Sequence, residues 1–152
     1  LPELMYKFHI FVESEQSDGI YSRSYPSFNN SSLTIAPSLQ HISGSEYIFN
    51  LQILNRHDNA WGDLNSFKNS YVMILCDSLV PIAGGLIGFT EKNGTFYPTA
   101  TNIQAGSEWS GQIRLNLLQV NADCRFRIHI EGIFSEYGQF SSDIDFDVFN
   151  IK

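Results

Sequence analysis

Hydrophobic and polar residues alternate along most of this chain with a period of two. Apolar side chains occupy every second position in residues 4–12, 47–53, 113–117, 126–130 and 144–148. A period of two places alternate side chains on opposite faces of a β-strand, one face toward a core and the other toward solvent. No segment has the apolar spacing of a long helix, and only residues 63–70 have room for a single helical turn.

Turn-forming residues divide these predicted strands. Asn93-Gly94 is typical of a two-residue β-hairpin turn and predicts a strand on either side. Pro37 is expected to end a short strand at residues 33–35, because proline lacks the N–H that a β-ladder uses. The continuous apolar run at residues 71–76 predicts a strand buried on both faces. About eight to nine short strands without helices predict an all-β fold, an antiparallel β-sandwich with jelly-roll or Greek-key-like connections.

The length and the charge narrow the class further. A chain of 152 residues is expected to form a single domain, residues 1–152. Its net charge of −7 argues against nucleic acid as a partner, and no apolar stretch is long enough for membrane insertion. The chain begins without methionine and ends on a strand-like segment. We therefore expect the C-terminal head of a longer protein.

The last two predicted strands carry opposite charges at alternate positions. The cationic set is Arg125, Arg127 and His129, and the anionic set is Asp143, Asp145 and Asp147. If the strands pair, each facing pair contributes about 0.2–1 kcal/mol. The alternative is a calcium site, but carboxylates on one strand face stand ~6.8 Å apart, too far for three to reach one ion without a loop. The pattern favours the charge-paired face.

The two cysteines, Cys76 and Cys124, have no CxxC partners, so a structural zinc site is not expected. The favoured interpretation of Cys76 is a buried free thiol at the end of an apolar run. A single disulfide between Cys76 and Cys124 is the alternative.

Motifs of catalytic chemistry are missing from the sequence. The four histidines lack the i, i+2 or i, i+4 spacing that often chelates a metal, and there is no Gly-x-Ser-x-Gly nucleophile elbow. The glycines at residues 84–88 are followed by no Lys-Ser or Lys-Thr pair, so they do not form a phosphate-binding loop. We therefore expect no enzyme activity, no catalytic residues, no metal and no cofactor.

The strongest candidate for ligand binding is a polar loop with an aromatic residue. The predicted binding residues are Arg56, His57, Asn59 and Trp61, together with Trp109 in a second loop. An indole face stacks on the apolar face of a sugar, while the polar groups bond its hydroxyls or an anionic carboxylate. The alternative is that each tryptophan plugs the end of the sandwich and the polar residues form turns.

The sequence also resembles a known family in its overall profile. Low charge, abundant Asn, Ser and Phe, and a terminal strand at residues 144–152 make the whole chain similar to the C-terminal receptor-binding head of an adenovirus fibre, of the non-mammalian type. The Thr-Leu-Trp-Thr entry of mammalian heads is absent, and the chain opens Leu-Met-Tyr-Lys-Phe at residues 4–8.

This resemblance implies a homotrimer on the virion surface. It also implies attachment to host cells through a cell-surface glycan, sialylated glycans included, or through a protein receptor. The alternative function is a carbohydrate-binding module or lectin domain of a larger secreted protein.

Overall fold

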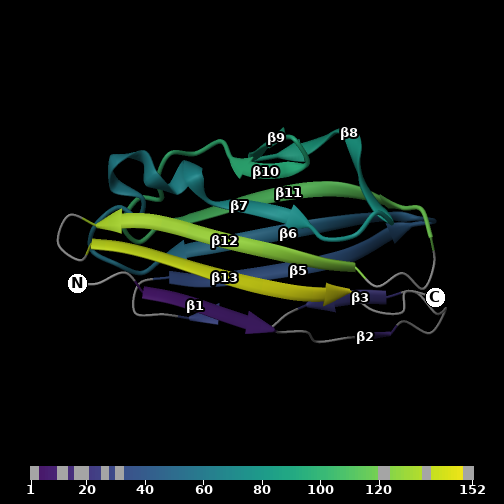
Figure 1. Cartoon of the computed structure of the whole chain (residues 1–152), viewed down its shortest axis with the longest axis horizontal. Coiled ribbons are helices and arrows are strands. Elements are labelled where there is room, and N and C mark those ends of the chain that lie inside the picture. Colours follow the sequence, from purple (N-terminus) through teal and green to yellow (C-terminus); the bar gives the residue numbers. More distant parts are fainter. Residues whose placement is uncertain are drawn as a thin grey trace.

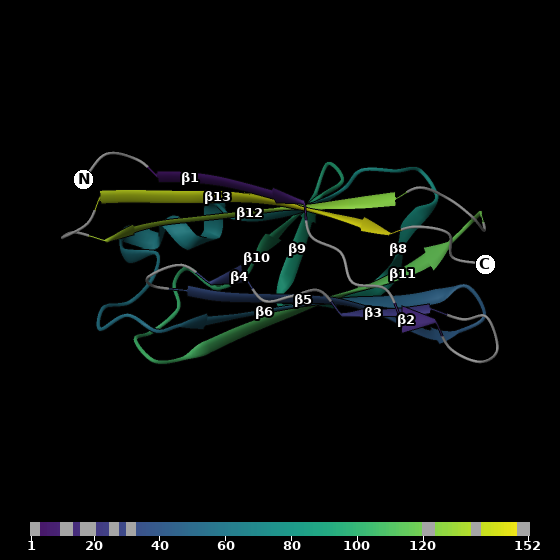
Figure 2. The ribbon, with the colours of Figure 1, turned by 90° about the horizontal axis from the view of Figure 1, so that it is seen from below.

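The structure is a computed structural model. It describes the backbone of residues 4–9, 14–15, 21–24, 28–29, 33–119, 124–134 and 138–148, and the side chains of residues 33–62, 65–119 and 124–131. These ranges contain thirteen strands and one short 3₁₀ helix, η1 (Asp63–Asn69). The strands form two sheets packed face to face, as Figure 2 shows. The predicted all-β sandwich is confirmed, and η1 lies within the range where one helical turn was predicted, although its seven residues make more than one turn.

One sheet has six strands. In spatial order they are β1 (Leu4–His9), β13 (Gly138–Val148), β12 (Cys124–Phe134), β7 (Tyr71–Ile74), β10 (Thr95–Pro98) and β9 (Phe89–Lys92). All neighbours are antiparallel except β1 and β13, which run parallel (Figure 1).

The other sheet has seven strands. Its order is β2 (Ser14–Glu15), β3 (Tyr21–Ser24), β5 (Leu33–Ser43), β6 (Glu46–Asn55), β11 (Glu108–Leu117) and β8 (Leu79–Ile87), with β4 (Phe28–Asn29) also paired to β5. The three two- to four-residue strands β2, β3 and β4 are too short for a hydrophobic period, which is why the sequence predicted fewer strands than the structure has.

The core lies between the sheets and follows the predicted alternation. Strand β6 buries Tyr47, Phe49, Leu51 and Ile53 and turns the intervening residues outward. The rings of Phe49 and Phe126 stack across the core with centroids 4.5 Å apart, which joins the two layers. Fully burying such a side chain contributes about 1.5–3 kcal/mol, so this alternation is the main source of the fold's stability.

Two predictions about strand extent are wrong. Strand β5 continues through Pro37 instead of ending before it. Pro37 is paired with Leu51 on β6, and on its other side neither of the described strands β3 and β4 has a residue in register with it. The missing N–H therefore breaks no ladder bond there. Strand β7 is shorter than the predicted run, and of its four residues only Val72 is buried, because β7 turns one face to solvent.

The predicted hairpin at Asn93-Gly94 is confirmed. Both turn residues have positive φ, 53° and 79°, and they join β9 to β10. Just before β9, Gly88 (φ +74°) carries the chain from the seven-stranded to the six-stranded sheet. A Cβ there would stand 2.8 Å from the carbonyl oxygen of Ser110, so only glycine fits this crossing.

The predicted charge pairing of the last two strands agrees with the observed register. Strands β12 and β13 place Arg125 opposite Asp147, Arg127 opposite Asp145 and His129 opposite Asp143. On the far side of β13, the parallel strand β1 places Lys7 opposite Asp143 and His9 opposite Asp145. The aspartate-bearing strand is thus flanked on both sides by register positions that carry Arg, Lys or His.

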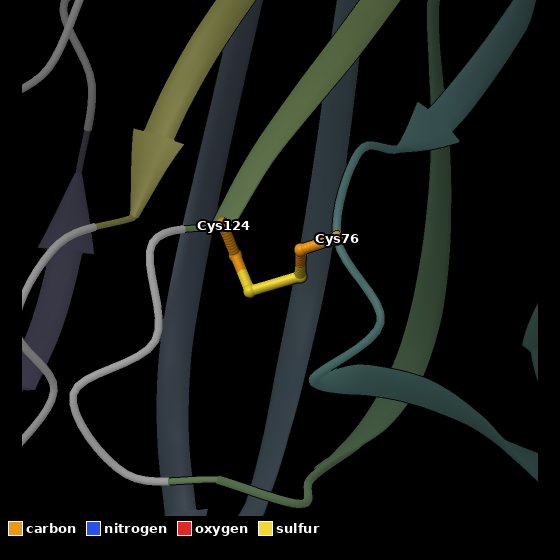
Figure 3. The surroundings of a disulfide bond; sticks show 2 residues. All are labelled: Cys76 and Cys124. Carbon is orange, nitrogen blue, oxygen red and sulfur yellow. A yellow bond between two sulfur atoms is a disulfide. The ribbon is translucent and has the colours of Figure 1, made fainter.

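The two cysteines form a disulfide, so the favoured free-thiol interpretation is wrong. Cys76 lies just after β7 and Cys124 opens β12 (Figure 3). Their Cα atoms are 5.1 Å apart, because Leu75 N–H donates to the Arg125 carbonyl at 2.7 Å and extends the ladder to this point. The sequence could not choose between thiol and disulfide, since the two cysteines are 48 positions apart and only the pairing of β7 with β12 brings them together.

Candidate functional site

The five predicted site residues converge at one end of the sandwich. Here the loop after β6, residues 56–62, meets the loop before β11, residues 99–107. Asn55 N–H donates to the Ser107 carbonyl at 2.9 Å, and Trp61 and Ile103 exchange two backbone hydrogen bonds of 2.8 Å. These bonds hold the two loops side by side.

A buried asparagine organises both loops. Asn55 is fully buried, and its Nδ2 donates to the carbonyls of Asn59 and Ile103, each at 2.9 Å, and to that of Gln104 at 3.3 Å. Its Oδ1 accepts from His57 N–H at 2.9 Å. Because a buried amide left without partners costs about 1–3 kcal/mol, this network holds the loops in one conformation. Asn55 was not among the residues predicted from the sequence, although a polar residue at the next inward position after Ile53 was a detectable signal.

The predicted polar residues lie at the surface of this end. Arg56 is exposed, and its guanidinium is anchored to β5: Nε donates to Thr34 Oγ1 and Nη2 to the Leu33 carbonyl, both at 3.0 Å. His57 and Asn59 are half-buried, and Asn59 N–H donates to His57 Nδ1 at 3.0 Å. These three residues lie together, so this part of the predicted constellation has the spatial grouping that a binding site needs.

The two tryptophans do not present their indole faces in the expected way. Trp61 is only 1% exposed, so the stacking role expected for it does not fit its position in the core. The next residue, Gly62, has φ +82°, and a Cβ there would come within 2.5 Å of Phe67 Cβ. The chain thus turns sharply into η1, which covers Trp61's end of the core.

Trp109 lies on strand β11, opposite Ile53, and not in a loop as predicted, and it is half-buried in an aromatic cluster. Its ring meets those of Phe67 and Phe89 edge to face, each with centroids 5.3 Å apart. Such pairs contribute about 0.5–1.5 kcal/mol beyond the buried area. Both tryptophans therefore have the position of the end plug that was the alternative interpretation, and the surface of this end is formed by the polar residues.

Neither a metal-binding cluster nor a membrane-crossing helix is found among the described residues. Among these residues, no group of three or more His, Cys, Asp or Glu side chains is placed to hold a metal ion. No helix among the described residues is long enough and apolar enough to cross a membrane.

No protein-family model and no curated protein sequence matches the chain. Several solved structures are similar to the chain at TM-scores below 0.5. The GAE domain of GGA2p from Saccharomyces cerevisiae is 13% identical, with a TM-score of 0.48, and the match covers 82% of this chain and 97% of that one.

Two larger proteins match over a small part of their own length. The secreted serine protease VesC from Vibrio cholerae is 12% identical (TM-score 0.43), and the match covers 76% of this chain and 23% of the protease. The GH20 exo β-N-acetylglucosaminidase from Vibrio harveyi is 8% identical (TM-score 0.40), with 71% of this chain and 17% of that one covered. Similarity at this level carries no argument about the fold or the function of this chain.

Proposed function

We propose that this domain is a non-catalytic attachment module that binds a host cell-surface glycan or protein, in the manner of a viral fibre head. The proposal includes a homotrimer displayed on a virion surface, without nucleic-acid or membrane-inserting activity. Three copies on one fibre gain avidity, so each individual site needs only weak affinity.

The observation that carries this proposal is the Asn55 network. It presents Arg56, His57 and Asn59 on a loop whose conformation is already held by buried hydrogen bonds. Binding to a preorganised loop loses less conformational entropy than binding to a mobile one. Polar loops on a rigid β-sandwich are a common location for recognition residues.

The disulfide favours the second candidate, a carbohydrate-binding module or lectin domain of a larger secreted protein. Cys76 and Cys124 are bonded, and disulfides persist in oxidising compartments such as the extracellular space. Both candidates share a surface-exposed binding role, and they differ in assembly: the fibre head is a trimer, whereas an appended module folds and binds as a monomer.

Two measurements test the proposal. Light scattering of the purified domain gives its mass, and a stable trimer supports the fibre head, whereas a monomer supports the secreted module. Flow cytometry with fluorescent domain, clustered on a multivalent carrier, then measures cell binding. We expect binding that falls severalfold in Arg56→Ala and Asn59→Ala. Arg114→Ala is the control for loss of a surface cation. Arg114 is exposed and lies toward the end of β11 that is farther from the polar loop. If the clustered domain binds none of the cell types tested, both candidate functions are contradicted.

A further inference from the structure

An open groove lies beside the polar end of the sandwich. It has a volume of about 770 Å³ and lies between the last residues of η1, the β9–β10 hairpin and the loop that follows β10. Helix η1 is held in place by the buried Ser70, whose Oγ accepts a hydrogen bond of 2.8 Å from Glu131 N–H on β12. The end of η1 that lines the groove is therefore tied to β12.

The groove combines an aromatic ring with hydroxyl groups. Tyr97 lines the groove and is half-buried. The ring of Tyr71 packs edge to face against the ring of Tyr97, with centroids 6.3 Å apart. Thr90 lies directly opposite Tyr97 on β9, and Thr99 and Thr101 line the groove from the next loop. An aromatic ring beside several hydroxyls matches the two faces of a sugar, one apolar and one carrying hydroxyls.

The charge of the groove is opposite to that of the chain. Lys68 at the end of η1 and Lys92 at the end of β9 both line the groove and are exposed, against one acidic residue, Glu91. Lys92 pairs with Thr95 and so shares a face of the hairpin with Tyr97, whereas Glu91, which is exposed and also lines the groove, pairs with Phe96 on the other face. Two lysines against one glutamate leave an excess of one positive charge on a chain of net charge −7, which favours an anionic ligand here.

We propose that this groove binds a carboxylate-bearing oligosaccharide, with the sugar ring on Tyr97 and the carboxylate between Lys68 and Lys92. The proposal rests on the attachment function proposed above, and it moves the sugar contact from the buried Trp61 to Tyr97. Lysine is suited to this role because its ammonium is a mobile point charge that follows a carboxylate across an open groove.

The test is an NMR titration of the ¹⁵N-labelled domain with 3′-sialyllactose and a hyaluronan tetrasaccharide, with lactose as the uncharged comparison. We expect shifts at residues 90–101 and at Lys68, with lactose at least fivefold weaker. The double variant Lys68→Gln/Lys92→Gln should lose about tenfold in affinity for the acidic saccharides and Tyr97→Ala a similar factor. Arg114→Gln, an exposed cation on the other sheet, is the matched control and should bind as wild type.

The outcomes separate this site from the proposed function. Acidic saccharides that bind with unchanged affinity to both groove variants, or lactose that binds as tightly as sialyllactose, would overturn the groove proposal. If Arg56→Gln alone abolishes that binding, the attachment function stands and the site is the polar loop. If neither acidic saccharide binds, the groove proposal fails, while cell binding by the clustered domain still decides the proposed function.

Discussion

Removing the disulfide should destabilise the domain by about 4 kcal/mol. The bond between Cys76 and Cys124 closes a loop of 48 positions, and a cross-link of that length lowers the entropy of the unfolded chain by roughly 14 cal/mol/K. At 25 °C this corresponds to about 4 kcal/mol, a large part of the 5–15 kcal/mol typical of a domain's unfolding free energy. For a domain of 152 residues, 1 kcal/mol corresponds to about 2–4 °C, so Tm should fall by about 8–16 °C.

The folded state should survive the loss. Strands β7 and β12 are joined by their own ladder from Phe126–Ile74 to His129–Tyr71, so the cross-link is not needed to pair them. The double variant Cys76→Ala/Cys124→Ala is preferred to serine, since Cys124 is only 1% exposed and a hydroxyl there would be buried. We expect a native-like spectrum at 25 °C and a lower urea midpoint.

The assay is urea unfolding followed by tryptophan fluorescence, with and without a phosphine reductant. Trp61, buried in the core, reports global unfolding. The wild type should shift its midpoint on reduction to that of the double variant, and the double variant itself should not respond to reductant. Two titratable thiols in the denatured, unreduced wild type would show that the disulfide does not form. Equal urea midpoints in the oxidised and reduced forms would show that loop closure does not stabilise the domain.

Three further changes test other parts of the structure. Asn55→Leu should lower the free energy of unfolding by about 3 kcal/mol, because carbonyls of both end loops lose their buried donor; a loss below 1 kcal/mol in chemical denaturation would contradict that role. Gly62→Ala should cost at least about 2 kcal/mol from its positive φ and its close contact with η1, whereas Gly94→Ala, with a similar φ and open space, should cost about 1 kcal/mol in the same assay. A double-mutant cycle of Arg127→Gln and Asp145→Asn should give a coupling of about 0.5 kcal/mol that disappears in 1 M salt; a zero coupling in low salt would show that the facing register positions do not interact.

Sequence reasoning succeeded where the interaction is local. The alternation from Tyr47 to Ile53 predicted which face of β6 is buried, since strand geometry alone assigns alternate side chains to opposite faces. Asn93-Gly94 predicted its hairpin because a two-residue turn needs positive φ at both positions. The charges of residues 125–129 and 143–147 indicated that opposite charges meet if the two strands pair, and the register of β12 with β13 agrees with this.

For the candidate residues, the sequence indicated which side chains lie together but not which of them are buried. The grouping of Arg56, His57 and Asn59 follows from their proximity in the chain. The burial of Trp61 does not, because it depends on Ile103, 42 positions away in the sequence, and on η1 closing over the core. Both tryptophans lie in polar sequence segments that resemble exposed loops. Local composition therefore could not distinguish a surface indole from a buried one.

The hydrophobic period and the turn residues were sufficient for the fold class, because they act between residues a few positions apart. Sheet order, the disulfide and the groove depended on contacts between distant segments. Cys76 meets Cys124 only through the pairing of β7 with β12, and the groove needs η1 and the β9–β10 hairpin to lie side by side. Such contacts depend on which strands pair across the whole chain, and a local pattern of apolar and polar residues is the same for many possible pairings.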